Sequence, residues 1–163
     1  MKFSSVLLFA TSIVSALAAP AASRSRPFNL KTAGSSNNEL NNFRVKNFGN
    51  HASFGAGEQD VRAYFADDGS RRLIVNGLDG TEDYAFLIPD TPGSPVSNFV
   101  FADTAVGGSR STEWGIIDGK LVYESKDRFY AFPTTDGWEI RWVNEGAITT
   151  ADSFPIDLAV EFI

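Results

Sequence analysis

The sequence predicts an all-β protein, a compact antiparallel β-barrel or β-sandwich of about 10–12 short strands. Apolar and polar residues alternate with period two through most of residues 28–163. Glycine and proline interrupt this alternation about every 8–12 residues, and no apolar set keeps helical spacing for long. A β-trefoil-like closed structure is the alternative, although the chain has no convincing threefold repeat.

The first predicted strands are short alternating runs at residues 28–32, 43–46, 61–66 and 71–76. The last two flank residues 67–70, Asp-Asp-Gly-Ser, which is a strong hairpin signal because Asp and Gly favour tight turns.

The second half of the chain continues the pattern. The predicted strands are 84–88, 99–101, 114–117, 121–123, the two arms of a hairpin at 129–142, and 156–162. Pro89 ends the first of these, because proline cannot donate to a strand ladder.

The hairpin FYAFPTTDGWEIRW concentrates aromatic rings, which could form a protein core or a platform that binds a ligand. Trp138, Ile140 and Trp142 share one face, and an isoleucine between two tryptophans is typical of a core. We therefore expect these residues to be buried, and Tyr130 and Phe132 on the first arm to be partly exposed.

The N-terminus has the features of a secretory signal. Lys2 precedes an apolar run at 6–16 and the small-x-small sequence Ala16-Leu17-Ala18. We expect a signal peptide at 1–18, a flexible leader at 19–27 and a single all-β domain at 28–163. The protein would then be secreted, either free outside the cell or associated with a cell wall.

Composition excludes several classes of function. The net charge is −6, and removal of Lys2 with the signal makes the chain one unit more acidic. Basic residues form no cluster, which argues against nucleic acid and against a membrane partner after signal cleavage. The absence of cysteine excludes a thiol nucleophile, an iron–sulfur cluster and a thiolate zinc site.

Three segments carry a family resemblance: PFNLKTAG, WGIIDGKLVYESKDRFYAFPTTDGWEIRW and FPIDLAVEFI. Together they resemble small secreted fungal proteins of the phialide-type (PhiA-like) cell-wall group. The resemblance implies framework positions at 28–32, 117–121, 129–133 and 156–163. Such proteins often carry Cys where this chain has Phe132, and another near Ser153. The resemblance implies an extracellular or wall-associated role and offers no catalytic residues.

Candidate catalytic groups were weighed against simpler interpretations. His51, the only histidine, is followed by Ser53, but no Gly-x-Ser-x-Gly elbow supports a Ser-His-Asp site, so a turn or surface histidine is expected.

A pair of carboxylates could hydrolyse glycosides. The candidates are Asp67, Asp68, Asp79, Glu82, Asp83, Glu113 and Glu139. Most lie at turns, and Glu139 is expected to point outward into solvent.

The acidic loop 79–83, with Asp90 nearby in the sequence, could supply oxygen ligands for calcium. It lacks the spacing of an EF-hand, so we expect a plain turn. No catalytic, cofactor or metal residue is therefore assigned.

Three functions follow, in decreasing order of support. The first is a non-enzymatic secreted fungal protein, extracellular or associated with the cell wall. The second is a carbohydrate-binding or effector-like host-interaction module, which would use exposed rings together with loops such as 82–84 or Asn98. Its partner would be a cell-wall polysaccharide or a host surface. The third is a glycoside hydrolase that uses paired carboxylates.

Overall fold

In the part of the chain that the structure describes, alternation of apolar and polar residues produces thirteen strands joined in a single sheet. The computed structural model describes residues 24–57, 59–104 and 109–163. The predicted signal peptide and residues 19–23 of the predicted leader lie outside the described residues. The strands are β1 Phe28–Ala33, β2 Lys46–Phe48, β3 His51–Phe54, β4 Gln59–Asp60, β5 Arg62–Phe65, β6 Leu73–Asn76, β7 Glu82–Pro89, β8 Val96–Ala102, β9 Trp114–Ile117, β10 Lys120–Tyr123, β11 Phe129–Thr134, β12 Gly137–Val143 and β13 Phe154–Phe162, and one 3-10 turn covers Asn38–Leu40.

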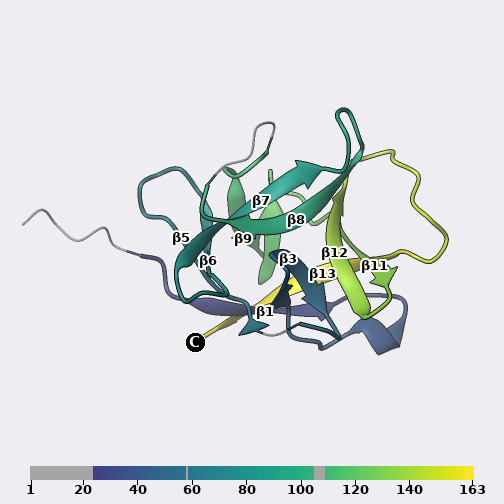
Figure 1. The fold of residues 1–163 in the computed structure, drawn as a ribbon, viewed down its shortest axis with the longest axis horizontal. Coiled ribbons are helices and arrows are strands. Elements are labelled where there is room, and N and C mark those ends of the chain that lie inside the picture. The colour runs from purple at the N-terminus through teal and green to yellow at the C-terminus, as the bar shows by residue number, and fades with distance from the viewer. Residues whose placement is uncertain (1–23, 58, 105–108) are drawn as a thin grey trace, which may run out of the picture.

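The sheet closes on itself as a nine-stranded antiparallel barrel with extra strands (Figure 1). Following hydrogen-bonded neighbours, the ring runs β3-β8-β7-β6-β5-β1-β13-β11-β12 and returns to β3. Strands β2, β4, β9 and β10 extend it. The closed ring confirms the predicted all-β class and identifies a barrel rather than a sandwich.

Strand β13 joins distant parts of the chain. It pairs with β1 over six residues, from Phe28 opposite Phe162 to Ala33 opposite Asp157, and also pairs with β10 and β11. Figure 1 shows β1 and β13 side by side near the C-terminus. The two ends of the folded domain are thereby held in one ladder of backbone hydrogen bonds.

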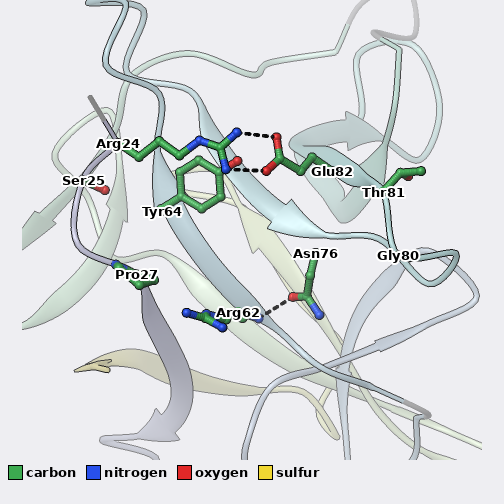
Figure 2. Close-up of a pocket in the computed structure, with 9 residues that line it drawn as sticks. All are labelled: Arg24, Ser25, Pro27, Arg62, Tyr64, Asn76, Gly80, Thr81 and Glu82. Atoms are coloured by element: carbon green, nitrogen blue, oxygen red, sulfur yellow. Dashed lines mark hydrogen bonds and ion pairs between the residues drawn. The ribbon is translucent and has the colours of Figure 1, made fainter. Parts of the chain in front are cut away.

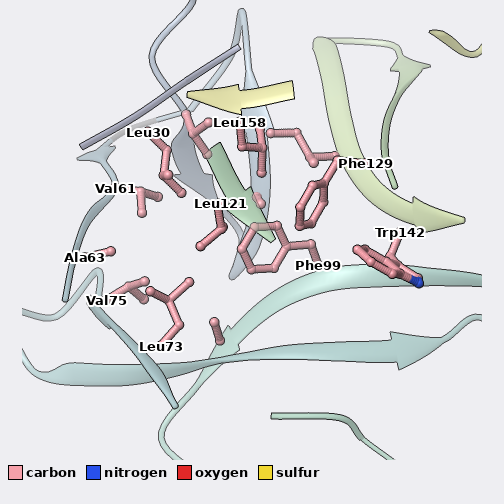
Figure 3. Packing of buried hydrophobic residues seen from close by; sticks show 14 of the residues in the cluster. Leu30, Val61, Ala63, Leu73, Val75, Phe99, Leu121, Phe129, Trp142 and Leu158 are labelled. Atoms are coloured by element: carbon pink, nitrogen blue, oxygen red, sulfur yellow. The ribbon is translucent and has the colours of Figure 1, made fainter. Parts of the chain in front are cut away.

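Aromatic rings fill much of the barrel interior. Phe99 lies at the centre of this cluster, with ring centroids 5.1 Å from Trp114 and 5.8 Å from Phe129 (Figure 3). The rings of Trp142 and Phe129 pack edge to face, with centroids 5.2 Å apart. Rings of this size each remove about 150–250 Å² from water, so this cluster is a major source of the barrel's stability.

The hairpin β11–β12 has the predicted faces. Ile140 and Trp142 are buried, while Trp138 is partly buried and packs against the core. Tyr130 and Phe132 lie on the opposite face and are partly exposed. The prediction of a buried core face is confirmed for Ile140 and Trp142, whereas Trp138 is only partly buried.

The structure differs from prediction at the second strand. A strand was expected at 43–46, but β2 is Lys46–Phe48. Residues 43 and 45 instead make backbone hydrogen bonds of 2.9 Å with Thr32 and Leu30 of β1. The hairpin β2–β3 turns at Gly49-Asn50, where both residues have positive φ. No strand is predicted at β3 or β4. His51 begins β3 rather than lying in a turn, but its side chain is 42% exposed, so the alternative of a surface histidine is confirmed.

Candidate functional site

Two hairpin tips meet at one side of the barrel and enclose a cleft of about 430 Å³, called here the His51 cleft. The tips belong to β2–β3 and β11–β12, which are joined by pairing of Phe54 with Trp138 and of Ser53 with Glu139. The cleft is lined by Phe48, Gly49, His51, Ser53, Ala56, Thr134, Thr135, Asp136, Trp138 and Glu139. Its volume is in the range of small-ligand sites.

Gly137 allows the two hairpins to approach closely. Its φ is 152°, and a Cβ at this position would lie 2.8 Å from the carbonyl oxygen of Phe54 and 3.0 Å from the nitrogen of Ala56. Backbone contact at this distance leaves no room for a side chain. Gly137, which begins β12 directly after the turn of this hairpin, therefore also fixes the geometry of the cleft.

Glu139 forms the centre of a charged network beside the cleft. Nδ1 of His51 lies 2.7 Å from Oε1 of Glu139, and Nη2 of Arg141 donates to Oε2 at 2.7 Å. Nη1 of Arg141 also donates to Asp90 at 3.2 Å. The Glu139 side chain is only 13% exposed, so the expectation that it is solvated is wrong. It does point away from the core, but its carboxylate is held between the side chains of His51 and Arg141.

The network sets the protonation state of Glu139. Burial acts to raise the pKa of this carboxyl, but the hydrogen bonds from His51 and Arg141 outweigh it and hold the pKa below its ordinary value. Glu139 is therefore a carboxylate at neutral pH and accepts hydrogen bonds.

Two aromatic rings lie beside these polar groups. Phe48 is 45% exposed at the end of β2. Trp138 is stacked on Phe54, with planes 7° apart and centroids separated by 6.2 Å, and it meets Phe154 edge to face. Stacking on one side holds the Trp138 ring in a fixed orientation where it lines the cleft.

Ser53 does not complete a catalytic triad. Its hydroxyl is within 3.3 Å of the carbonyl oxygens of Lys46 and Ala56, to which it can donate. His51 and Ser53 line the same cleft, and a Glu rather than an Asp contacts the histidine. Sequence spacing could not reveal this contact, because His51 and Glu139 are 88 positions apart.

Several other predicted carboxylates are paired with arginine in separate places. Asp68 pairs with Arg72, Glu82 with Arg24, and Glu113 with Arg71. Asp90 instead shares Arg141 with Glu139 and so belongs to the network beside the cleft. Asp67 lies at the exposed β5–β6 turn. Asp90 lies at the far end of β7 from the loop 79–83, so the structure does not bring it to Asp79 and Asp83, which line one hollow.

A second hollow of about 330 Å³, the Arg24 pocket, lies where residues 24–27 meet β5 and β7 (Figure 2). The Arg24 guanidinium donates to both carboxylate oxygens of Glu82, at 2.7 and 3.2 Å, and lies 4.9 Å from the centre of the Tyr64 ring. Burial, followed by the contact with Glu82, raises the pKa of Tyr64, so this phenol stays neutral. Arg24 and Glu82 satisfy each other's charge, which favours a structural role of this pair in attaching residues 24–27 to the barrel.

Within residues 24–57, 59–104 and 109–163, no group of three or more His, Asp or Glu side chains could hold a metal ion. The same residues include no helix of sufficient length and apolarity to cross a membrane. No protein-family model, curated protein or solved structure matches the sequence.

Proposed function

We propose that this chain is an exported, non-enzymatic protein that binds cell-wall polysaccharide in the His51 cleft. The observation that carries the proposal is the combination, in one cleft of about 430 Å³, of the rings of Phe48 and Trp138 with the polar groups of His51, Asp136 and Glu139. The signal-like N-terminus and the resemblance to secreted fungal wall proteins support export and a wall location.

The chemistry of the cleft suits a sugar. A pyranose ring has an apolar C–H face, which stacks on an aromatic ring, and a rim of hydroxyl groups that donate and accept hydrogen bonds. Asp136 presents an exposed carboxylate acceptor, and Thr134 and Thr135 supply hydroxyl groups. A cleft with an apolar surface and a few placed polar groups is the usual form of a small-ligand site.

The state of Glu139 argues against a role as the general acid of a glycosidase. A glycosidase needs one carboxyl with a raised pKa that remains protonated and donates to the leaving oxygen. The pKa of Glu139 is lowered, and Arg141 and His51 occupy its oxygens. This carboxylate suits binding rather than general acid catalysis.

The test is retention of the purified chain on insoluble chitin, β-glucan and mannan. We expect retention on at least one polysaccharide, and we expect Phe48→Ala to reduce it by about tenfold. Phe162→Ala is the matched control, because Phe162 is 51% exposed and lies outside the cleft. This control should bind as the parent chain does.

Two outcomes would count against the proposal. Retention on none of the three polysaccharides removes the binding function. Release of soluble reducing sugar by the parent chain, lost in Glu139→Gln, shows that the protein is an enzyme.

A further inference from the structure

An acidic hollow of about 580 Å³ lies beside the His51 cleft, on the other side of the β2–β3 turn. Gly49 and His51 line the cleft, and Asn50 between them lines this acidic hollow. The turn is fixed to the barrel, because the Asn50 carbonyl accepts a 2.8 Å hydrogen bond from the nitrogen of Phe101. The His51 cleft and the acidic hollow are therefore neighbours, and Gly49-Asn50 at the tip of the β2–β3 hairpin lies between them.

The acidic hollow carries charge of one sign. It is lined by Asn50, Leu78, Asp79, Thr81, Glu82, Asp83, Ala102 and Asp103, and none of these residues is basic. Arg24 neutralises Glu82 from the side of the Arg24 pocket. Asp79, Asp83 and Asp103 have no ion pair with a described residue.

Asp83 is the most informative of these groups. The residue is 9% exposed, and its side chain has no hydrogen bond or ion pair within the described residues. Gly77 makes room for it, since a Cβ there would lie 2.9 Å from Oδ2 of Asp83 and 3.1 Å from Oδ1 of Asp79. Burial, then the charges of Asp79 and Asp103, raises the pKa of Asp83. A buried carboxylate without a partner is unfavourable unless a cation approaches it.

A bare metal ion does not fit this arrangement. No three carboxylates in the described residues lie close enough together to hold one. The hollow is instead wide enough for an organic cation, and its charges are spread along its wall. A surface of this kind concentrates ligands with several separated positive charges.

We infer that the acidic hollow extends the binding surface of the His51 cleft, and that the bound polysaccharide carries free amino groups, as in polymers of β-1,4-linked glucosamine. The inference rests on the proposed function, because sugar rings stacked in the cleft bring the next residues of the polymer across Gly49-Asn50. Each ammonium group there meets Asp79, Asp83 or Asp103. Asp136 adds negative charge to the cleft itself, whereas Arg141 compensates the charge of Glu139 and no Lys or Arg lines the cleft.

The experiment compares two ligands of equal length, an oligomer of β-1,4-linked glucosamine and its fully N-acetylated counterpart, by titration calorimetry at low salt. We expect the free-amine oligomer to bind about tenfold more tightly. Asp79→Asn with Asp83→Asn should remove this preference and leave binding of the acetylated oligomer unchanged. Phe48→Ala should weaken binding of both oligomers.

The matched control is Asp67→Asn with Asp152→Asn, which changes the net charge equally at two exposed turns and should keep the preference. If the double variant does not fold, Asp103→Asn alone tests the same hollow and should reduce the preference. Folding is checked in each case by thermal unfolding.

The outcomes separate the two proposals. Binding of the acetylated oligomer with no preference for the amine overturns this inference but supports the proposed function. Failure to bind either oligomer, together with no retention on any polysaccharide, overturns both. An oligolysine that binds equally well in the parent and in Phe48→Ala would show that the hollow accepts any polycation, and calcium binding that is lost in Asp83→Asn would show a metal site. Either result would overturn the inference.

Discussion

Nδ1 of His51 lies 2.7 Å from Oε1 of Glu139, although 88 positions separate these residues in the chain. The contact joins β3 to β12 beside the cleft, and Arg141 holds the other oxygen of the same carboxylate. The sequence predicts that Glu139 is solvated, but with these contacts its side chain is only 13% exposed.

Glu139→Gln is expected to lower the free energy of unfolding by about 1–3 kcal/mol near neutral pH, because charge-assisted hydrogen bonds to Arg141 and His51 are lost. The lowered pKa of Glu139 gives stability that is present above the pKa of the unfolded chain and is lost as pH falls through the lower folded value. The difference between parent and variant should therefore shrink in acid.

Urea unfolding at about pH 7 and about pH 3 measures this effect. Glu145→Gln is the control, since Glu145 is 75% exposed in its pair with Lys126 and should matter little. An equal loss of stability at both pH values would contradict the assigned network.

Asp83→Asn is expected to stabilise the ligand-free protein at neutral pH and to raise its Tm by about 2–4 °C. The folded pKa of Asp83 is raised, so its ionisation destabilises the fold as pH rises above the ordinary carboxyl value. Below that value the two proteins should be equally stable. Asp79→Asn should not stabilise, because hydrogen bonds from Thr81 lower the pKa of Asp79. A lower Tm for Asp83→Asn at neutral pH would show that the carboxylate has a favourable partner.

Gly137→Ala is expected to destabilise the barrel by about 2–3 kcal/mol and to weaken ligand binding in the cleft. The added Cβ would overlap the carbonyl of Phe54 at 2.8 Å in a backbone conformation that favours glycine. Gly119→Ala is the control, since φ is 76° and no atom lies within 4 Å of its added Cβ. It should lose only about 1 kcal/mol, from conformation alone. If urea unfolding shows the same loss of stability for Gly137→Ala and Gly119→Ala, the close approach to Phe54 is not the cause of the destabilisation.

Phe129→Ala is expected to lower the free energy of unfolding by about 3–5 kcal/mol, because the ring is fully buried among Phe99, Trp114 and Trp142. Phe132→Ala, three residues along the same strand and on the opposite face, should lose about 1 kcal/mol, mainly its contact with Arg141 at 5.1 Å. Chemical denaturation of both variants checks the assignment of faces. A larger loss of stability for Phe132→Ala than for Phe129→Ala would contradict this assignment of faces.

Local sequence patterns predicted much of the fold. The strand at 114–117 has the predicted bounds, and Pro89 is the last residue of β7. The faces of β11–β12 were also predicted correctly, because alternation places successive side chains on opposite sides of a strand. The hairpin β2–β3 was missed, since its strands are short and its turn signal, Gly49-Asn50, is flanked by few apolar residues.

The all-β class and the inward direction of most rings follow from local sequence patterns, because these properties depend on residues within a few positions of one another. Three features are visible only in the folded chain: the sheet closes into a ring, two distant hairpin tips form the His51 cleft, and Asp79, Asp83 and Asp103 share a hollow. These features depend on pairing between strands far apart in the chain. Alternation specifies which face of a strand is buried, but it carries no information about which strand will cover the other face.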